Sequence, residues 1–307
     1  MNKEKIMTFK NELDYEKMMS EIYEMTKKHS CIKLSYIGNT ILSRPIPLLT
    51  IGNKNAKGAV LYVATHHATE NLCTNVLLEF ANEYATAVEQ NRRVCQINST
   101  LLYDTRTIYI VPMLNPDGVE YRLHGIDSQN PLFERIEKIT NGDFSSWNAN
   151  ARGVDLNHNY DAYFNEYKEI EKAKEITQGA TKYSGESPES EPETKALCTF
   201  IRYHADKLKG VISLHSQGEE FYYTSRGMCP KKSEFVARFV ARMTGYIPAC
   251  PSDSAEYGGL TDWLIKEMDI PAFTIECGKG KNPLPVSQIP SIYVHMHDLL
   301  FSFPILL

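Results

Sequence analysis

The feature that most constrains the fold of this chain is its alternation of short apolar segments with longer segments of helical spacing. Between the short segments, 71–90 and 233–245 carry apolar residues three or four positions apart, the spacing of an amphipathic helix. This alternation predicts an α/β fold with a central, mixed but mostly parallel sheet flanked by helices. The predicted strands are 58–64 (GAVLYVA), 107–114 (TIYIVPML), 210–214 (GVISL) and 271–275 (PAFTI).

One segment, 181–197, raises the question of whether the chain divides into two domains. It is rich in Ser, Pro and Glu, as linkers often are. However, Ser190 stands three residues before Glu193, with Pro192 between them, which predicts a capping box at the start of a helix. We therefore interpret the segment as a loop on the side of the functional site. The prediction is a single domain over 1–307 with a helical lead-in at about 1–30.

Composition and charge exclude several classes of function. A chain of 307 residues with 42% hydrophobic content can bury a sizeable core and is not disordered. Its net charge of -5 and the even spread of Lys and Arg argue against nucleic acid, and an acidic surface argues against anionic lipid. The segment LLFSFPILL at 299–307 is too short to span a bilayer and is expected to pack against the core. We therefore expect no nucleic acid and no membrane as partners.

Two features bear on the cellular compartment. Residues 1–18 alternate charge with isolated apolar residues and lack the apolar core of a signal peptide. The seven cysteines are an odd number without C-x-x-C spacing, which fits neither a disulfide framework nor a structural zinc site. We expect a cytoplasmic protein, and the sequence leaves its oligomeric state open.

Residues capable of chemistry follow the predicted strands at the points where these strands end. His67 and Glu70 follow the first strand, His215 follows the third and Glu276 follows the fourth. Ligands of open α/β sheets bind beyond the carboxyl ends of the strands, so these residues can converge there. Two imidazoles and a carboxylate make a three-ligand zinc set that leaves one position for water. A second glutamate could then act as general base toward that water.

Each of these residues also has an ordinary structural explanation. Glu70 could complement a helix dipole, and His215 could be a hydrogen-bonded residue at a strand end. The occurrence of all four at equivalent strand ends is what favours a metal site. His66 is expected to point away from the metal site, because the side chains of neighbouring residues diverge.

Rival chemistries find little support in the sequence. There is no G-x-S-x-G elbow of a serine hydrolase, no G-x-x-x-x-G-K-[ST] phosphate loop and no G-x-G-x-x-G dinucleotide motif. The pair His295 and His297 could chelate a metal, but we expect an H-x-H pair near the C-terminus to lie at the surface or in packing.

Six motifs together resemble the zinc metallocarboxypeptidases. More closely, they are similar to the bacterial branch that hydrolyses the γ-D-glutamyl-diaminopimelate bond of cell-wall peptides. The resemblance runs from about 15 to 295 with the motifs in the expected order. The motifs are HATE (67–70), PMLNPDG (112–118), NARGVDLNHNYDA (150–162), LHSQGEE (214–220), GGLTDW (258–263) and FTIECGKGKNPLP (273–285).

The resemblance implies a carboxypeptidase-like fold, a Zn2+ cofactor and roles for individual residues. His67, Glu70 and His215 would be the zinc ligands. Glu276 would be the base and proton shuttle toward a metal-activated water. In this family a nearby arginine stabilises the tetrahedral intermediate, and Arg152 is the candidate for that role.

One departure from the family pattern concerns the substrate. Typical members have Asn-Arg-Asn where this chain has Asn-His-Asn at 157–159. Their arginine holds the terminal carboxylate of the substrate with two hydrogen bonds, which imidazole cannot reproduce, so a specialised substrate is expected. The tyrosine that closes over substrate in pancreatic-type enzymes aligns near Ser254, with Tyr257 as a candidate replacement. The substrate-binding candidates are Asn157, His158, Tyr257 and Thr261.

The resemblance implies a zinc metallopeptidase, a carboxypeptidase-type hydrolase, and we expect it to cleave the γ-D-glutamyl-meso-diaminopimelate bond of small murein peptides. Its role would be murein peptide recycling, or processing within a spore-forming cell. Two alternatives stay open: a zinc-dependent N-acyl amino acid deacylase, and a catalytically silent binding module of the same fold. The NPDG segment and the neighbourhood of Asn157 favour the peptidase, and the intact set of four site residues argues against the silent module.

Overall fold

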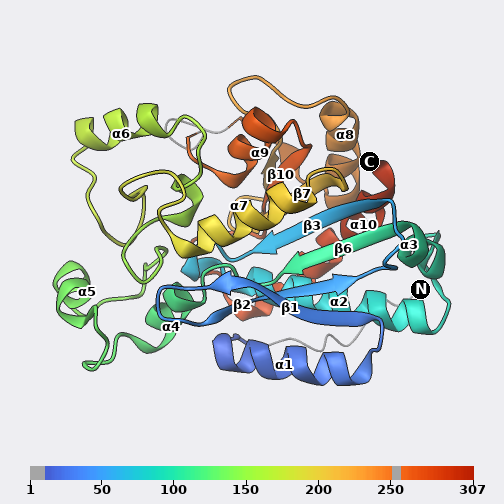
Figure 1. Cartoon of the computed structure of the whole chain (residues 1–307), viewed down its shortest axis with the longest axis horizontal. Coiled ribbons are helices and arrows are strands. Elements are labelled where there is room, and N and C mark those ends of the chain that lie inside the picture. Colours follow the sequence, from blue (N-terminus) through green and yellow to red (C-terminus); the bar gives the residue numbers. More distant parts are fainter. Residues whose placement is uncertain (1–10, 251–256) are drawn as a thin grey trace.

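Over the residues that the structure describes, 11–250 and 257–307, an eight-stranded mixed sheet forms the centre of the fold (Figure 1). In this computed structural model the strand order is β1-β2-β6-β3-β7-β10-β8-β9, and β4 (Arg93–Val94) pairs with β5 (Ile97–Asn98) in a separate hairpin. The strands of the main sheet are β1 (Ile32–Asn39), β2 (Pro45–Ile51), β3 (Gly58–Ala64), β6 (Arg106–Val111), β7 (Leu208–His215), β8 (Glu220–Tyr222), β9 (Ile247–Pro248) and β10 (Ala272–Glu276).

Helices connect these strands and cover both faces of the sheet. Short 3-10 helices occupy Ala68–Glu70, Leu156–His158 and Val286–Gln288. The α-helices are α1 (Tyr15–Lys28), α2 (Leu72–Glu89), α3 (Ser99–Thr105), α4 (Pro116–His124), α5 (Phe133–Thr140), α6 (Phe164–Ala173), α7 (Pro192–His204), α8 (Ser233–Thr244), α9 (Leu260–Met268) and α10 (Ile289–Leu306).

The four central strands, β6, β3, β7 and β10, run parallel to one another and separate two hydrophobic cores. Along β3, Val60 and Tyr62 face one core, whereas Leu61 and Val63 face the other. Because both faces of β3 are covered, the strand is apolar at every position, as buried parallel strands are. Antiparallel pairs extend the sheet on both sides, so the predicted α/β fold with a mixed, mostly parallel sheet is confirmed.

The first core is covered by α2, α8 and α10, and the second by α7 and α9. Figure 1 shows α7 in front of the strands, with α2 and α10 behind them. The C-terminal segment packs against the core as expected, with Leu299, Phe301 and Phe303 buried in α10. No helix of the described ranges has the length and apolar character needed to cross a membrane.

The predicted strands are confirmed, with small differences in their bounds. The third and fourth predicted strands differ from β7 and β10 by one or two residues at the ends. β6 ends at Val111, before the predicted end, because Pro112 has no N–H to donate to a sheet ladder. Four strands of the main sheet, β1, β2, β8 and β9, were not predicted, and Pro45 and Pro47 weaken the strand pattern of β2.

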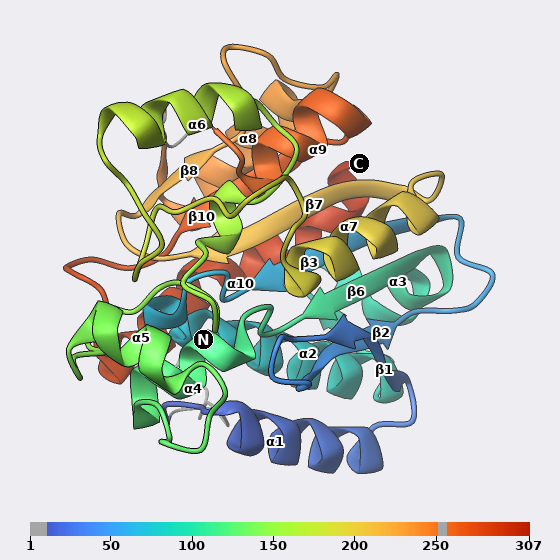
Figure 2. The same cartoon turned by 60° about the vertical axis from the view of Figure 1, so that its left-hand side comes forward.

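The predicted helices at 71–90 and 233–245 correspond to α2 and α8. At the N-terminus, α1 agrees with the predicted helical lead-in from residue 15 onward, while residues 1–10 lie outside the described part. The bounds predicted for the whole domain stay a prediction. Between α4 and α7 the chain adds no strand to the main sheet, and Figure 2 shows α5 and α6 of this segment outside it.

The predicted capping box at the start of α7 is wrong. The helix begins at Pro192 and has no side-chain hydrogen bond at its cap. Ser190 Oγ donates instead to Glu191 Oε1 at 2.9 Å and accepts from Asn159 Nδ2 at 2.9 Å. Glu193 turns inward and is fully buried. The pattern located the helix start correctly, but tertiary contacts took both side chains away from the cap.

Glu193 is a buried carboxyl with few polar contacts. Its Oε2 accepts from Asn150 Nδ2 at 3.4 Å, and its Oε1 has no hydrogen-bond partner within the described residues. Burial, followed by the carboxylates of Asp117 and Glu191, raises the pKa of Glu193 to about 8. The folded state therefore holds this proton to a higher pH than the unfolded state, and the resulting stabilisation is lost as the pH rises from about 4.5 through about 8.

Glu193→Gln removes this charge while keeping the shape, so we expect a pH-dependent effect on stability. At pH 5 the variant and the wild type should have similar free energies of unfolding. At pH 9 the variant should be more stable by roughly 2–4 kcal/mol. Urea unfolding at both pH values measures the difference, with the exposed Glu234 in the first turn of α8 as the control, changed to Gln. An equal difference at both pH values would contradict the raised pKa.

Candidate metal centre and active site

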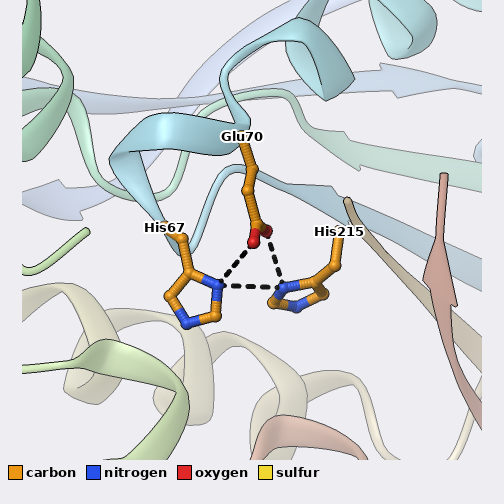
Figure 3. A group of neighbouring side chains, drawn as sticks. All are labelled: His67, Glu70 and His215. Atoms are coloured by element: carbon orange, nitrogen blue, oxygen red, sulfur yellow. Dashed lines mark hydrogen bonds and ion pairs between the residues drawn. The ribbon is translucent and has the colours of Figure 1, made fainter. Parts of the chain in front are cut away.

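His67, Glu70 and His215 converge on one point (Figure 3). Nδ1 of His67 lies 3.1 Å from Glu70 Oε1, and Nδ1 of His215 lies 3.0 Å from Glu70 Oε2. The two Nδ1 atoms are 3.3 Å apart. Donor atoms held about 2.0–2.2 Å from a tetrahedral zinc ion lie about 3.3–3.6 Å from one another. The three side chains therefore fit a single zinc ion with little movement.

The sheet explains why these residues meet. β3 and β7 are parallel neighbours, with Ala64 paired to Leu214 at their carboxyl ends. His67 and Glu70 follow β3 across the short helix Ala68–Glu70, whereas His215 is the last residue of β7. The predicted convergence beyond adjacent strand ends is therefore observed. His66 points elsewhere, as expected, with its Nε2 2.8 Å from the hydroxyl of Tyr160.

Both histidines are held on the side that faces away from the cluster. Asp155 Oδ1 lies 3.1 Å from His67 Nε2, and Ser213 Oγ lies 3.1 Å from His215 Nε2. Contacts of this kind fix the tautomer and orientation of a metal-binding imidazole. They leave both Nδ1 atoms free to face a shared ion.

The electrostatics of the cluster suit a cation. Burial raises the pKa of Glu70, but the opposite effect of His67 and His215 is larger, and the resulting pKa is about 2. Burial likewise opposes ionisation of Asp155, yet His67 holds its pKa well below the usual range. Burial lowers the pKa of His67, and the carboxylates of Glu70 and Asp155 outweigh it and hold that pKa well above its usual value. Two carboxylates thus surround one imidazole, and a metal ion can replace the proton that they favour.

Glu276 is the last residue of β10 and lies beside this cluster. Its Cα is paired with that of His215 across the parallel strands, and with that of Glu220 on the other side. Burial, followed by the carboxylate of Glu70, raises the pKa of Glu276 well above its usual range. A carboxyl of raised pKa beside a metal site suits general acid and base catalysis near neutral pH.

A cavity of about 70 Å³, lined mainly by residues whose side chains carry polar groups, opens beside Glu276. The Oγ1 atoms of Thr261 and Thr274 are 2.7 Å apart, and Asn157 Oδ1 accepts from the backbone N–H of Leu260 at 3.1 Å, at the start of α9. Two of the predicted substrate-binding residues, Asn157 and Thr261, line this cavity. Its walls are formed by Asn157, Tyr222, Thr224, Gly259, Thr261, Asp262, Thr274 and Glu276.

The other two predicted substrate residues, His158 and Tyr257, are not among the walls of this cavity. Nδ1 of His158 lies 2.7 Å from the carbonyl oxygen of Tyr257. The ring of His158 stacks on Tyr167 with the centroids 4.2 Å apart. Ser254 lies outside the described residues. Contact of His158 or Tyr257 with substrate stays a prediction.

Arg152 lines a second, larger cavity of about 180 Å³ together with Arg135 and Gln178. Its Nε donates to Glu191 Oε2 at 3.1 Å, and its Nη2 donates to the carbonyl oxygen of Ser190 at 3.2 Å. Arg152 does not line the cavity beside the metal cluster. Its role toward a tetrahedral intermediate therefore stays a prediction.

Sequence reasoning missed several groups that support the site. Asp155 contacts His67, and Asn282 Nδ2 donates to Glu70 Oε1 at 3.1 Å. Both lie inside motifs noted above, at 150–162 and 273–285. The motifs could have drawn attention to them, but no local pattern shows which distant ligand each one supports.

Comparison with known proteins decides the family. A model of the zinc carboxypeptidases matches residues 18–296, most of the chain. The chain belongs to the zinc carboxypeptidase family. As a zinc carboxypeptidase it is a metallopeptidase, its cofactor is Zn2+, and the cluster of His67, Glu70 and His215 could bind that ion.

Relatives of this zinc carboxypeptidase include a bacterial endopeptidase. Gamma-D-glutamyl-L-diamino acid endopeptidase 1 of Lysinibacillus sphaericus is 32% identical over 283 residues, which cover 91% of this chain and 69% of the relative. The structure of thrombin activatable fibrinolysis inhibitor has a TM-score of 0.72 at 20% identity and covers 100% of this chain and 76% of that one. Murein-tripeptide amidase MpaA from Escherichia coli O157 has a TM-score of 0.54 at 20% identity, covering 87% and 90%. The two structures confirm the carboxypeptidase-like fold.

Proposed function

We propose that this zinc carboxypeptidase hydrolyses the bond between γ-D-glutamate and meso-diaminopimelate in small murein peptides. The observation that carries the proposal is the cavity beside Glu276, in which every wall residue except Gly259 has a polar group in its side chain. The relative from Lysinibacillus sphaericus, which is named for a γ-D-glutamyl bond to a diamino acid, supports the same bond type.

The cavity suits a side chain that carries both charges. Gly259 and Thr261 stand at the start of α9, where the helix dipole favours a carboxylate, and Asp262 contributes a carboxylate that favours an ammonium group. The far end of meso-diaminopimelate carries one ammonium and one carboxylate. A phenylalanine side chain offers neither group, so it would gain no charge-assisted contact with this end of the cavity.

The proposed chemistry assigns a role to each site residue. His67, Glu70 and His215 would hold the zinc ion, which when bound acts as a Lewis acid and lowers the pKa of water from about 15.7 toward about 7. Glu276 would accept a proton from the water and pass it to the amine of the departing diamino acid. Arg152 would stabilise negative charge on the attacked carbonyl. Substrate contacts are proposed for Asn157, His158, Tyr257 and Thr261.

We place the reaction in the cytoplasm, where it would recycle small murein peptides or process them during sporulation. All seven cysteines are free, which suits a reducing compartment. An N-acyl amino acid deacylase is not favoured by any contact in the site. A silent binding module is disfavoured because His67, Glu70, His215 and Glu276 are all present around one point.

The proposal predicts a strong preference among substrates. We expect kcat/KM for L-Ala-γ-D-Glu-meso-diaminopimelate to exceed that for the matching L-Lys peptide by about tenfold to a hundredfold, because lysine lacks the distal carboxylate and a charge-assisted hydrogen bond is worth roughly 1.5–3 kcal/mol. Blocked peptides ending in Phe or Arg should scarcely react. Mass spectrometry of the products identifies the bond that is cleaved.

Two variants sharpen this test. Thr261→Val should narrow the preference for diaminopimelate over lysine, because it removes a hydroxyl from the cavity wall. Thr199→Val, at an exposed threonine of α7, should leave the preference unchanged. If kcat/KM for the Phe peptide equals or exceeds that for the diaminopimelate peptide, the proposed substrate is wrong and the protein is an ordinary carboxypeptidase. Hydrolysis of N-acetyl amino acids alone would favour the deacylase.

A further inference from the structure

A second group of metal-ligand side chains lies at Cys95, His297 and Asp298. Cys95 lies in the turn between β4 and β5, and the other two are consecutive residues of α10. Cys95 Sγ is 3.5 Å from His297 Nδ1 and 3.1 Å from Asp298 Oδ1. His297 Nδ1 and Asp298 Oδ1 are 2.7 Å apart. Within the described ranges, only this cluster and the one at the active site bring three such donor atoms within 4.8 Å.

The distance between the sulfur and the imidazole nitrogen of the second cluster matches that of a metal centre. A sulfur held about 2.3 Å and a nitrogen held about 2.0–2.1 Å from a tetrahedral zinc ion lie about 3.6 Å apart. The Sγ to Nδ1 distance of 3.5 Å fits this value. The contacts with the carboxylate oxygen are shorter than a tetrahedral ion requires, as are the two contacts of Glu70 at the active site. A small rotation of the Asp298 side chain, which is 59% exposed, would accommodate an ion.

The far nitrogen of the imidazole also has a carboxylate beside it. His297 Nε2 lies 3.5 Å from Glu83 Oε1, and Tyr293 donates to Glu83 Oε2 at 2.8 Å. His67 has the same arrangement, with Asp155 at its Nε2. A carboxylate in this position orients a metal-bound imidazole and increases its basicity. The two clusters thus share a close group of three donor atoms and an outer carboxylate beside one imidazole.

Solvent can reach the second cluster. The side chain of His297 is 24% exposed, and Cys95 is partly buried. An ion can therefore enter from solvent and keep water as its remaining ligand. Of the H-x-H pair, only His297 belongs to this cluster, and His295 Nδ1 lies 2.6 Å from the carbonyl oxygen of Thr244.

We propose that Cys95, His297 and Asp298 form a second metal site that takes a divalent transition ion such as Zn2+. A thiolate and an imidazole select zinc-like ions over magnesium or calcium, which prefer oxygen ligands. Binding releases the thiol proton and joins the β4–β5 hairpin to α10, so the ion has a structural role. The site does not depend on the function proposed for the active centre.

Cobalt binding to the full-length, metal-depleted protein tests this site. Thiolate ligation of Co2+ gives a near-ultraviolet charge-transfer band, which the active centre cannot give because its three ligands contain no sulfur. We expect the wild type to bind about two ions per chain at micromolar free Co2+ and to show the band. Cys95→Ser should bind about one ion and show no band, whereas Cys229→Ser, at another partly buried thiol, should behave as the wild type does.

Two further variants separate the sites and guard against misfolding. His297→Gln keeps the thiol and should also lose one ion, with the far-ultraviolet circular dichroism unchanged. His215→Ala should lose one ion but keep the band. A wild type that binds one ion without the band, or a band that persists in Cys95→Ser, would overturn the second site and leave the active-site assignment intact.

Discussion

Replacing Glu276 by glutamine is expected to lower turnover of the murein peptide at least about a hundredfold while the metal content stays unchanged. Glutamine keeps the size of the side chain but cannot accept a proton from water. Glu276 ends β10 in register with His215 and belongs to the wall of the cavity, and the variant replaces none of the proposed metal ligands. Steady-state kinetics and elemental analysis of the same preparation measure turnover and zinc together.

Glu219→Gln is the matched control for this prediction. Glu219 lies close to the site in sequence but is paired with Lys279 at 2.8 Å, at a partly exposed position. Its replacement should leave turnover near the wild-type value. If instead Glu276→Gln reacts at the wild-type rate, the base must be sought at Glu219 or Glu220.

Replacing His215 by alanine is expected to remove about one zinc ion per chain and to lower activity on the order of a thousandfold or more. The variant keeps His67 and Glu70, but two ligands hold zinc poorly where a catalytic site normally has three from the protein. Without the ion, several kcal/mol of charge stabilisation are lost from the reaction. Elemental analysis and product formation report the two effects.

An exposed histidine provides the control for the metal prediction. His124 is 54% exposed at the end of α4, and His124→Ala should keep both the zinc and the activity. Circular dichroism should show that His215→Ala retains its secondary structure. Full zinc content and full activity in His215→Ala would show that His215 is not a ligand.

The centre of the fold and the metal cluster could be predicted because their signals are local. The sequence of β3 is apolar at every position, which indicates burial on both faces of the strand. His67 and Glu70 follow this strand within a few residues. The end of each parallel strand then places its next residues at the same edge of the sheet. The convergence of the three proposed ligands could therefore be predicted without knowing the exact strand order.

The supporting groups could not be predicted in this way, because each depends on a contact between distant segments. Asp155 reaches His67 across 88 positions of sequence, and Asn282 reaches Glu70 across 212. The capping box failed for a related reason, since burial of Glu193 against other elements overrode the local pattern. Cys95 gave no signal at all, because its partners stand about 200 residues later in the chain.

The segment between α4 and α7 adds no strand to the main sheet. Catalysis and substrate selection can therefore depend on different parts of the chain. The proposed metal ligands stand at the strand ends of the sheet, whereas the wall around Arg135 and Arg152 comes from this segment. Insertions or deletions in it can therefore change which substrates fit while the reaction itself stays the same. The freedom stops at Arg152, which is proposed to act on the attacked carbonyl, and at Asp155, because a shift there would release His67. Within these limits, new specificities can arise by remodelling one stretch of chain, with no change to the catalytic apparatus.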